Sequence, residues 1–389
     1  MALEKLHAHR GTIAIVGAAE SDELGKLPHK SALMMHAEAA RNALDDAGLK
    51  AKDVDAVLST GRQTANDVPE YLGISPRYLD NTQMGGCSFI AHLQHALGLI
   101  NAGVAEVVLI THGESGYSWV GMGGGRGFGA DTPAGQFELP FGVGGPPTRY
   151  SLAATRHMHE FGTTKEQLAE VAVATRKWAQ LNPKALMRDP ITIADVLNSK
   201  MISWPFNLLD CCVVTDGGGA LVVTSAERAQ SCKKKPIYVL GTGEASCHSI
   251  IVQMPRFHVW DAAVMSGERA WAMSGVKHSD IDLAMFYDAF TIVPILALEA
   301  LGFCKPGEGG PFVANQRTAP GGAFPMNTNG GGLSYTHTGM YGMFSLVEAV
   351  RQLRGECGER QVKGATTAVC HGTGGILSAA ATAILSTDR

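Results

Sequence analysis

The sequence lacks several features that assign a protein to a class at once. Of its 389 residues 17% are charged, the net charge is −4, and only Lys233–Lys235 form a basic run, so we expect no nucleic-acid partner. It has no apolar run of membrane length, and the polar segment 1–10 does not resemble a signal peptide, so we expect no membrane association. Its eight cysteines have no regular spacing, which favours a reduced, cytoplasmic protein.

Several catalytic and cofactor motifs are also missing. No Gly-x-Ser-x-Gly elbow is present. The glycine run 121–129 has no clear strand before it or helix after it, and Gly241-Thr-Gly243 lacks the third glycine of a dinucleotide fingerprint, so a nicotinamide dehydrogenase is not expected. His92 and His95 are spaced as a possible ligand pair on a helix. Further ligands at convincing spacing are lacking, so we expect no metal.

What the sequence does contain centres on Cys87. This cysteine follows Gly85 and Gly86 and precedes an apolar run with helical spacing, which ends near Asn101–Gly103. The pattern places Cys87 at the N-terminus of a buried helix, where free amide donors and the helix dipole lower the pKa of a thiol. The competing interpretation is a buried structural cysteine, since free cysteines are among the most buried residues.

The chain also repeats itself. Residues 47–58, AGLKAKDVDAVL, align without a gap with residues 274–285, SGVKHSDIDLAM, and the glycine, the lysine and both aspartates are identical. The offset of 227 residues between Asp53 and Asp280 is close to that of 224 between Gly17 and Gly241. Strand-helix-strand patterns at 12–58 and 236–285 therefore predict two duplicated α/β halves, with helices layered between two sheets.

A segment between these halves does not follow the repeat. Glycine-rich stretches are followed by helical patterns at 152–160 and 165–180, and a strand at 216–224 rejoins the first half. We predict an N-terminal half of residues 1–113 plus 205–232, an inserted loop domain of residues 114–204, and a C-terminal half of residues 233–389. Inserted loops often carry ligand contacts. Five large side chains here could shape a bulky pocket or belong to the core: Met122, Phe128, Phe137, Phe141 and Tyr150.

Three further stretches bring reactive residue types to the ends of strands or glycine turns. Tyr287-Asp-Ala-Phe290 follows a predicted strand. The glycine-rich turn 327–332 precedes His337, and Cys370-His371-Gly372 lies between a predicted strand at 366–369 and a predicted helix at 376–385. Each stretch alone fits a tight turn, a buried thiol or a core aromatic. Together they place a tyrosine, a thiol and two histidines where α/β sheets present catalytic groups.

These motifs resemble the thiolase superfamily over nearly the whole chain, and more closely its sterol-carrier-protein-type, lipid-transfer-protein-like thiolase branch. The resemblance implies an α/β thiolase fold of αβαβα layers. Cys87 matches the nucleophilic cysteine, and His337 matches the histidine of the Gly-His-Pro motif. Cys370 and Gly372 match the Cys-x-Gly motif.

Two departures from the family pattern stand out. His337 is flanked by Thr336 and Thr338 instead of glycine and proline, and Tyr287 replaces an asparagine or histidine that helps to build an oxyanion hole. A tyrosine hydroxyl can still donate a hydrogen bond or act as an acid. Thiolase-fold side-chain aldolases are similar in using tyrosines in this region, and they need no nucleophilic cysteine.

The resemblance implies a CoA-dependent acyltransferase that cleaves or forms a 3-oxoacyl-CoA. Cys87 would attack the carbonyl with His337 as its base, and Cys370 would move a proton to or from the acetyl-type carbanion. The amides of Cys87 and Gly372 would bind the acyl oxyanion, and His337 and Tyr287 would stabilise the enolate. Coenzyme A would be a co-substrate, with no covalently bound cofactor and no CoA-binding residue assigned.

Other roles stay open in the sequence. His371 is either a supporting group or an acid/base that assists Cys370. One alternative to the acyltransferase is a retro-aldolase on a β-hydroxyacyl-CoA. The presence of both thiols argues against it, because an aldolase requires neither. The other alternative is a non-catalytic acyl-CoA or lipid carrier. The resemblance also implies a homodimer or higher homo-oligomer, and a possible separate zinc-containing OB-fold subunit.

Overall fold

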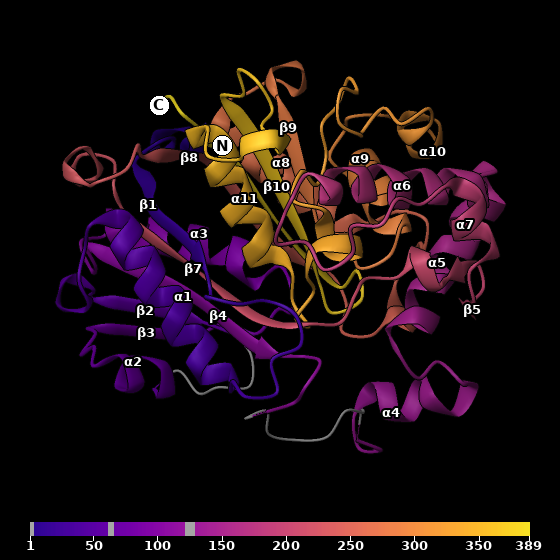
Figure 1. Cartoon of the computed structure of the whole chain (residues 1–389), viewed down its shortest axis with the longest axis horizontal. Helices are drawn as coiled ribbons and strands as arrows, with labels where there is room; N and C mark the ends of the chain where they lie inside the picture. The colour runs from indigo at the N-terminus through magenta and orange to yellow at the C-terminus, as the bar shows by residue number, and fades with distance from the viewer. Residues whose placement is uncertain (1–3, 61–65, 121–128) are drawn as a thin grey trace.

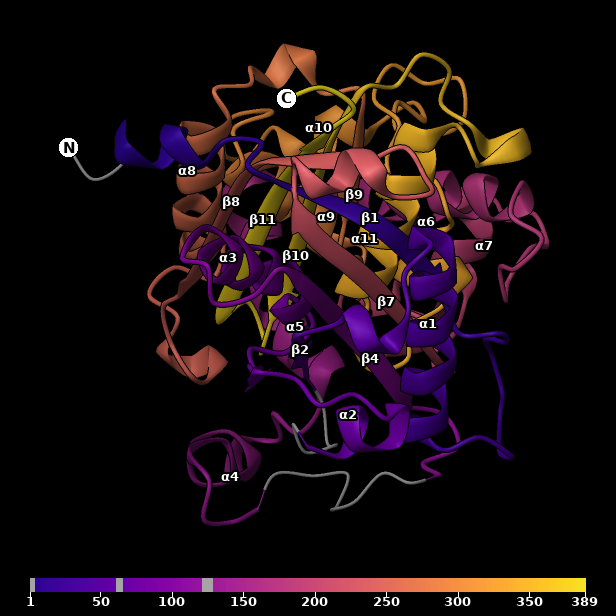
Figure 2. The same ribbon diagram turned by 90° about the vertical axis from the view of Figure 1, so that its left-hand side faces the viewer.

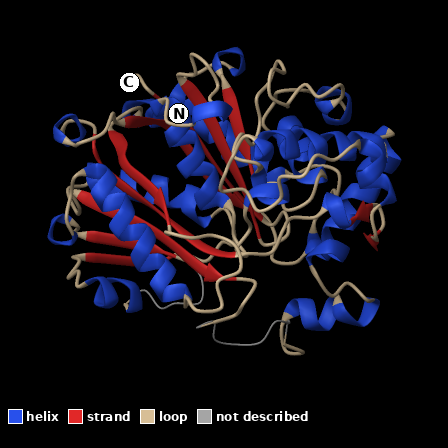
Figure 3. Cartoon of the chain, viewed as in Figure 1, coloured by secondary structure: helices blue, strands red, loops and turns tan. Residues whose placement is uncertain are grey.

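The strands that the structure describes form one large mixed sheet and one small one. The structure is a computed structural model that describes residues 4–60, 66–120 and 129–389. The strands are β1 (Ile13–Glu20), β2 (Ala56–Ser59), β3 (Tyr78–Asn81), β4 (Val107–Ser115), β5 (Met201–Ser203), β6 (Phe206–Asn207), β7 (Asp216–Ser225), β8 (Ile237–Ser246), β9 (Leu283–Phe286), β10 (Thr367–Gly374) and β11 (Ala379–Ser386). In the described residues the large sheet has the order β3-β2-β4-β7-β1-β8-β11-β10-β9, and β5 pairs with β6 (Figures 1 and 3).

The helices cover this sheet and fill the space between its halves. They are α1 (Ala32–Ala47), α2 (Asp67–Leu72), α3 (Ser88–Asn101), α4 (Pro133–Phe137), α5 (Pro146–Phe161), α6 (Lys165–Gln180), α7 (Ile193–Asn198), α8 (Asp261–Ser274), α9 (Ile292–Ala300), α10 (Gly309–Val313) and α11 (Gly342–Arg354). A search of the described helices finds none with the length and apolar character that a membrane span requires.

The two halves have the same strand pairing, as the internal repeat predicts. In the first half β1 is antiparallel to β7, β7 is antiparallel to β4, and β4 is parallel to β2. In the second half β8, β11, β10 and β9 repeat these three relations in the same order. The halves join where β1 and β8 pair antiparallel through Ala14–Tyr238 and Ile15–Ile237. The predicted duplication is confirmed.

The repeated glycines have matching structural reasons. A Cβ atom on Gly17 would overlap the carbonyl oxygen of Ala43 in α1, and one on Gly241 would overlap that of Ala270 in α8. Each helix therefore crosses its strand too closely for any side chain. α1 and α8 also both end at a glycine with positive φ, the usual helix C-cap.

The helices form the predicted layers. α1 packs on β1, β4 and β7, and α8 packs on β8 and β11, so these two helices are outer layers. α3 and α11 contact each other and strands of both halves, so they form the middle layer. Figure 2 shows α8 at the left and α1 at the right, with strands of the sheet between them. The αβαβα thiolase fold expected from the sequence is confirmed. The two expected sheets are, in the described residues, halves of one nine-stranded sheet that is continuous through β1 and β8.

The segment between β4 and β7 holds α4 to α7 and the β5-β6 pair. The helical patterns at 152–160 and 165–180 are confirmed as parts of α5 and α6. α6 packs against the second half: the indole of Trp178 donates to the Thr318 carbonyl, and the Asn182 amide donates to the Asn329 carbonyl. The three predicted domain ranges stay a prediction.

One predicted element is wrong. Residues 376–385 form no helix but most of β11, which pairs antiparallel with β10 and β8. A short, fully buried apolar run has no polar face, so its periodicity cannot distinguish a strand from a helix. β10 is also longer than predicted and includes Cys370, His371 and Gly372. Because neighbouring side chains of a strand point to opposite faces, Cys370 and His371 cannot share one site.

Candidate active site

Tyr287 lies directly after β9, whose last residue is Phe286. Its side chain is 5% exposed, and its ring packs on Gly86 so closely that a Cβ atom there would overlap it. The Tyr287 hydroxyl oxygen lies 2.8 Å from Nε2 of His337. The residue that departs from the family motif is therefore paired directly with the histidine that matches it.

The loop that carries His337 is held by the residue next to Tyr287. The buried Asp288 carboxylate accepts hydrogen bonds from the amides of Gly332 at 2.6 Å and Leu333 at 3.4 Å. These amides belong to a π-helical turn, Gly331–Tyr335. Burial raises the pKa of Asp288 to about 7. Tyr287 and Asp288 thus point to different groups, one to His337 and the other to the turn that precedes it.

The two threonines beside His337 anchor the same loop. The Thr338 hydroxyl lies 2.7 Å from Nε2 of the buried His112, on β4. The Thr336 hydroxyl lies 2.7 Å from the Thr215 hydroxyl, which also accepts a hydrogen bond from the His337 amide at 2.9 Å. In place of a Gly-His-Pro turn, side-chain hydrogen bonds to the first half fix the position of His337.

The Tyr287–His337 pair is neutral at physiological pH. Burial lowers the pKa of His337 to about 4. Burial also raises the pKa of Tyr287 far above its usual range, although the Tyr341 amide favours the ionised form. The proton therefore stays on the tyrosine, and in the tautomer of His337 that is protonated on Nδ1 the hydroxyl donates to the Nε2 lone pair. Such a pair can take up and return one proton.

Tyr287 and His337 open onto a cavity of about 440 Å³. Its walls are mostly apolar, and the rings of Tyr150 and Phe290 lie 4.9 Å apart in them. Besides these four, the described lining residues are Gly116, Pro146, Pro147, Ile202, Leu208, Cys211, Cys212, Val214, Ala289, Gly339, Gly375 and Ile376. A larger cavity of about 570 Å³ between α1 and α2 is lined by none of the predicted site residues that the structure describes.

Cys87 lies at the N-cap of α3, as predicted, but its sulfur is packed away. The side chain is fully buried, its Sγ lies 3.8 Å from the Met84 carbonyl, and a Cβ atom on Gly374 would come within 2.6 Å of it. Burial raises the pKa of Cys87 to about 12, so the predicted lowering is wrong. Desolvation outweighs the helix terminus here.

The other thiol lies on the same side of the sheet as Cys87. Cys370 is fully buried, its Sγ lies 3.8 Å from the carbonyl oxygen of Ser345 in α11, and burial raises its pKa. Gly372 lies against Cys87, because a Cβ atom on it would be 3.1 Å from the Cys87 Cα. Neither Cys87 nor Cys370 is among the described residues that line the 440 Å³ cavity.

His371 lies on the opposite face of β10 from Cys370. Its Nδ1 is 2.8 Å from the Thr382 hydroxyl, and its ring centroid is 4.8 Å from that of Trp260. Burial lowers its pKa to about 3. The structure therefore brings Tyr287 to His337 and Gly372 to Cys87, and leaves His371 away from both pairs.

Several lining residues gave little or no signal in the sequence. Cys211 and Cys212 line the cavity but match no motif. Of the five large side chains of the predicted insertion, Tyr150 lines the cavity, whereas Phe137 and Phe141 are 59% and 80% exposed. Residues 122 and 128 lie outside the described residues. Asp288 belongs to the Tyr287–Phe290 motif, but no sequence pattern predicts its hydrogen bonds to the turn Gly331–Tyr335.

Comparison with known proteins gives the family. Residues 243–387 match the model "Thiolase C-terminal domain-like". The chain is 36% identical over 358 residues to a steroid side-chain-cleaving aldolase of Thermomonospora curvata, which covers 89% of this chain and 91% of that protein. The chain belongs to the thiolase superfamily, in its sterol-carrier-protein and lipid-transfer-protein branch. It is a thiolase-like enzyme.

Other members differ in the reactions that their names state. The chain is 35% identical to the 17-hydroxy-3-oxo-4-pregnene-20-carboxyl-CoA lyase of Mycobacterium tuberculosis, over 89% of this chain and 92% of the lyase. It is 32% identical to an acetyl-CoA acetyltransferase of Methanothermobacter thermautotrophicus, over 96% and 99%. A solved structure named "Ltp2-ChsH2(DUF35) aldolase" superposes with a TM-score of 0.89 at 34% identity, over 98% of this chain and 99% of that one.

Proposed function

We propose that this enzyme is a retro-aldolase that cleaves a β-hydroxyacyl-CoA, with Tyr287 and His337 as its proton-handling pair. The observation that carries the proposal is the 2.8 Å contact between the Tyr287 hydroxyl and His337 Nε2 at the wall of a cavity that neither Cys87 nor Cys370 lines. An acyl-cysteine mechanism needs a thiolate in contact with substrate, and burial raises the pKa of Cys87 to about 12.

The pair supplies what a retro-aldol cleavage requires. The substrate hydroxyl gives its proton to the Tyr287 oxygen as the tyrosine proton passes to His337 Nε2. The Cα–Cβ bond breaks, its electrons form the enolate of the thioester, and the β-carbon becomes a carbonyl. The proton then returns through Tyr287 to the α-carbon. The products are a ketone or aldehyde and a shorter acyl-CoA, and no free CoA or oxidant is consumed.

The cavity supports a substrate with a bulky apolar group at the β-carbon. Tyr150 and Phe290 form an aromatic wall, and the mouth carries the exposed apolar side chains of Ile202, Leu208 and Val214. Flat aromatic walls suit cyclic ligands, as drug-sized pockets show generally. Two relatives that cover most of the chain are named for steroid side-chain cleavage and for a pregnene carboxyl-CoA lyase. We therefore propose a cyclic, steroid-like substrate class.

We also propose two kinds of protein partner. A solved aldolase of the same fold is named as a complex with a DUF35 protein. A separate subunit of this type fits the sequence-based expectation of a small zinc-containing OB-fold partner. We also propose that the chain forms a homodimer or a higher homo-oligomer. Size-exclusion chromatography of the chain alone and co-expressed with such a subunit measures both associations.

Product analysis separates the aldolase from the acyltransferase. The enzyme is incubated with a β-hydroxyacyl-CoA bearing a cyclic β-substituent, without free CoA, and products are identified by mass spectrometry. Equal amounts of ketone and shortened acyl-CoA are expected. The matched arm is the 3-oxoacyl-CoA of the same skeleton with free CoA. Thiolysis in that arm, together with an acyl adduct on Cys87, would overturn the proposal.

A further inference from the structure

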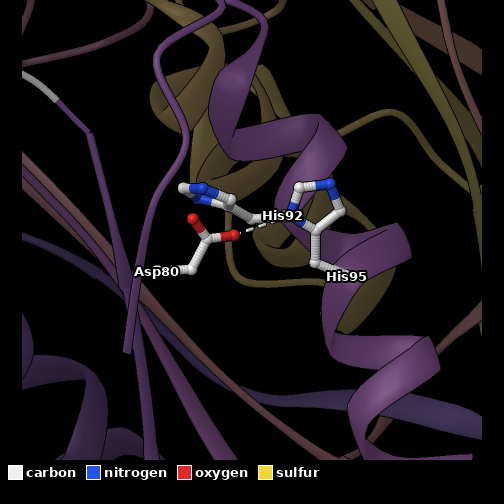
Figure 4. A group of neighbouring side chains, drawn as sticks. All are labelled: Asp80, His92 and His95. Carbon is white, nitrogen blue, oxygen red and sulfur yellow. Dashed lines mark hydrogen bonds and ion pairs between the residues drawn. The ribbon is translucent and has the colours of Figure 1, made fainter. Parts of the chain in front are cut away.

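A second cluster of reactive side chains lies outside the cavity, between the edge strand β3 and helix α3. Asp80 comes from β3, and His92 and His95 come from α3, nearly one turn apart. One ligand atom from each of the three lies within 4.8 Å of the others. Figure 4 shows the carboxylate of Asp80 facing the two imidazole rings. Among the residues that the structure describes, no other group of three histidines, cysteines or acids is this compact.

His92 is the unusual member of this cluster. It is fully buried, and within the described part of the chain neither of its ring nitrogens has a hydrogen-bond partner. Burying a polar group without a hydrogen-bond partner destabilises the folded state, so a bound ligand at His92 would explain why a histidine occupies this position. An unpartnered imidazole nitrogen offers the lone pair that binds metals.

His95 is held in the orientation of a metal ligand. Its Nδ1 lies 3.1 Å from the Asp80 carboxylate, and its Nε2 lies 3.2 Å from the carboxylate of Glu244 on β8. A carboxylate on the outer nitrogen is the arrangement that orients metal-bound histidines. The side chains of Asp80 and His95 are 25% and 24% exposed, which gives an ion access from solvent.

We propose that Asp80, His92 and His95 bind one divalent cation of the Zn²⁺ or Co²⁺ class. Imidazole and carboxylate ligands suit these ions, and a water would occupy the fourth position. The ion would take the place of the hydrogen bond between His95 Nδ1 and Asp80, while His95 Nε2 keeps its contact with Glu244. Tetrahedral ligand atoms lie about 3.4 Å apart, so small side-chain rotations close the site.

The proposal goes beyond the carbon–carbon cleavage described above and does not depend on it. It differs from the sequence-based expectation of no metal because the third ligand comes from a strand that precedes the helix, at a spacing that no helical motif predicts. A bound ion would tie β3 to α3, the helix that Cys87 begins. Its expected effect is on stability, with no step of the proposed reaction routed through it.

The test measures metal on the full chain after treatment with a chelator and dialysis against Zn²⁺ or Co²⁺. We expect one ion per chain by elemental analysis, a higher thermal midpoint, and the visible absorption of four-coordinate Co²⁺ without a sulfur-to-cobalt charge-transfer band. Asp80→Asn and His92→Leu should each lose the ion. His29→Ala removes an exposed histidine 3.4 Å from Glu23 and should keep it.

Three results would overturn the site. In the first, the unaltered chain retains no ion. In the second, the Asp80 and His92 variants retain the ion. In the third, a charge-transfer band assigns the ion to thiols such as Cys211 and Cys212. If His92→Leu fails to fold, Asp80→Asn still tests the site. Asp80 lies on the partly exposed edge strand β3, and asparagine keeps an acceptor oxygen for His95, so this variant should fold.

Discussion

The thiol pair and the tyrosine–histidine pair occupy different surroundings, although both match family motifs. Cys87 and Cys370 belong to one buried hydrophobic cluster, in the layer of α3 and α11. Tyr287 belongs to another cluster and, with His337, lines the 440 Å³ cavity. The Tyr287 ring covers Gly86, the residue directly before Cys87. The cavity thus reaches the tyrosine–histidine pair and, among the described lining residues, neither thiol.

A residue can therefore match a catalytic motif and still lie buried outside the cavity, as Cys87 does. A thiol performs nucleophilic chemistry only as an accessible thiolate. Burial raises the pKa of Cys87 to about 12, whereas burial of Tyr287 and His337 produces a neutral donor and acceptor that fit proton transfer.

The largest effect is expected from Tyr287→Phe. The variant keeps the ring that packs on Gly86 and loses only the hydroxyl 2.8 Å from His337. We expect kcat for CoA-free cleavage to fall by about 10²–10⁴-fold, the usual contribution of a positioned acid or base. Steady-state kinetics measure it, and the thermal midpoint should move little.

Tyr341→Phe is the matched control for that variant. Its ring centroid lies 5.6 Å from that of Tyr287, but its hydroxyl donates to Asn329 at 2.8 Å and not to His337. We expect kcat to stay within a few-fold and some stability to be lost, because Asn329 loses a buried partner. Equal losses of kcat in both variants would contradict the special role of Tyr287.

The pH dependence of cleavage should report His337. The imidazole must be unprotonated to accept a proton, and burial lowers its pKa to about 4. The rate should therefore stay level as the pH falls from 8 to 5 and decline near pH 4, where the histidine becomes protonated. His337→Gln should lower kcat by about 10²-fold and remove this limb. A rate that rises toward pH 12 would indicate the Cys87 thiolate instead.

A smaller effect is expected from Asp288→Asn. Asp288 is a positioning residue, since it contacts the turn before His337. An amide keeps one acceptor oxygen, so we expect kcat to fall by about tenfold with little change in KM, which is about 1.4 kcal/mol in the barrier.

The stability of the Asp288 variant has a predictable pH dependence. Burial raises the pKa of Asp288 to about 7, above its unfolded value of about 3.8. The folded state therefore holds a proton that the unfolded chain releases, and this stabilisation is lost as the pH rises from about 4 to 7. Asn cannot titrate, so thermal midpoints of the variant relative to the original protein should rise from pH 5 to pH 8. A constant difference would contradict the assignment.

Much of the fold could be predicted from the sequence because identical residues make the same hydrogen bonds in the two halves. Asp53 and Asp280 each accept the amide of the lysine three residues earlier, at 2.9 and 3.3 Å. Asp55 and Asp282 each accept backbone amides at the start of the next strand in space, β4 or β10. The bonds of Asp53 and Asp280 are local to a strand-helix-strand unit, and those of Asp55 and Asp282 reach the equivalent neighbouring strand in each half, so the sequence repeat reflects both.

Only part of the site could be predicted, because the burial and pKa of its residues depend on contacts between segments that are far apart in the sequence. The glycine turn before His337 and the motif that contains Tyr287 predict that both residues belong to the active site. Whether a sulfur is buried depends on Gly374, which is 287 positions away from Cys87 and covers its Sγ. The cavity likewise joins α5, the loops around β6 and the end of β9. No spacing along the chain contains that information.

The smallest effect is expected at the thiols themselves. Cys87→Ala and Cys370→Ala should each change kcat for CoA-free cleavage by less than about threefold, below ~0.7 kcal/mol in the barrier, because neither sulfur lines the cavity. Each should lower the thermal midpoint slightly, since a packed sulfur is removed from the core. Alkylation mapped by mass spectrometry should label Cys211 or Cys212, in the cavity wall, before Cys87. A loss above 10²-fold in Cys87→Ala, with Cys87 labelled first, would return the thiol to the centre of the mechanism.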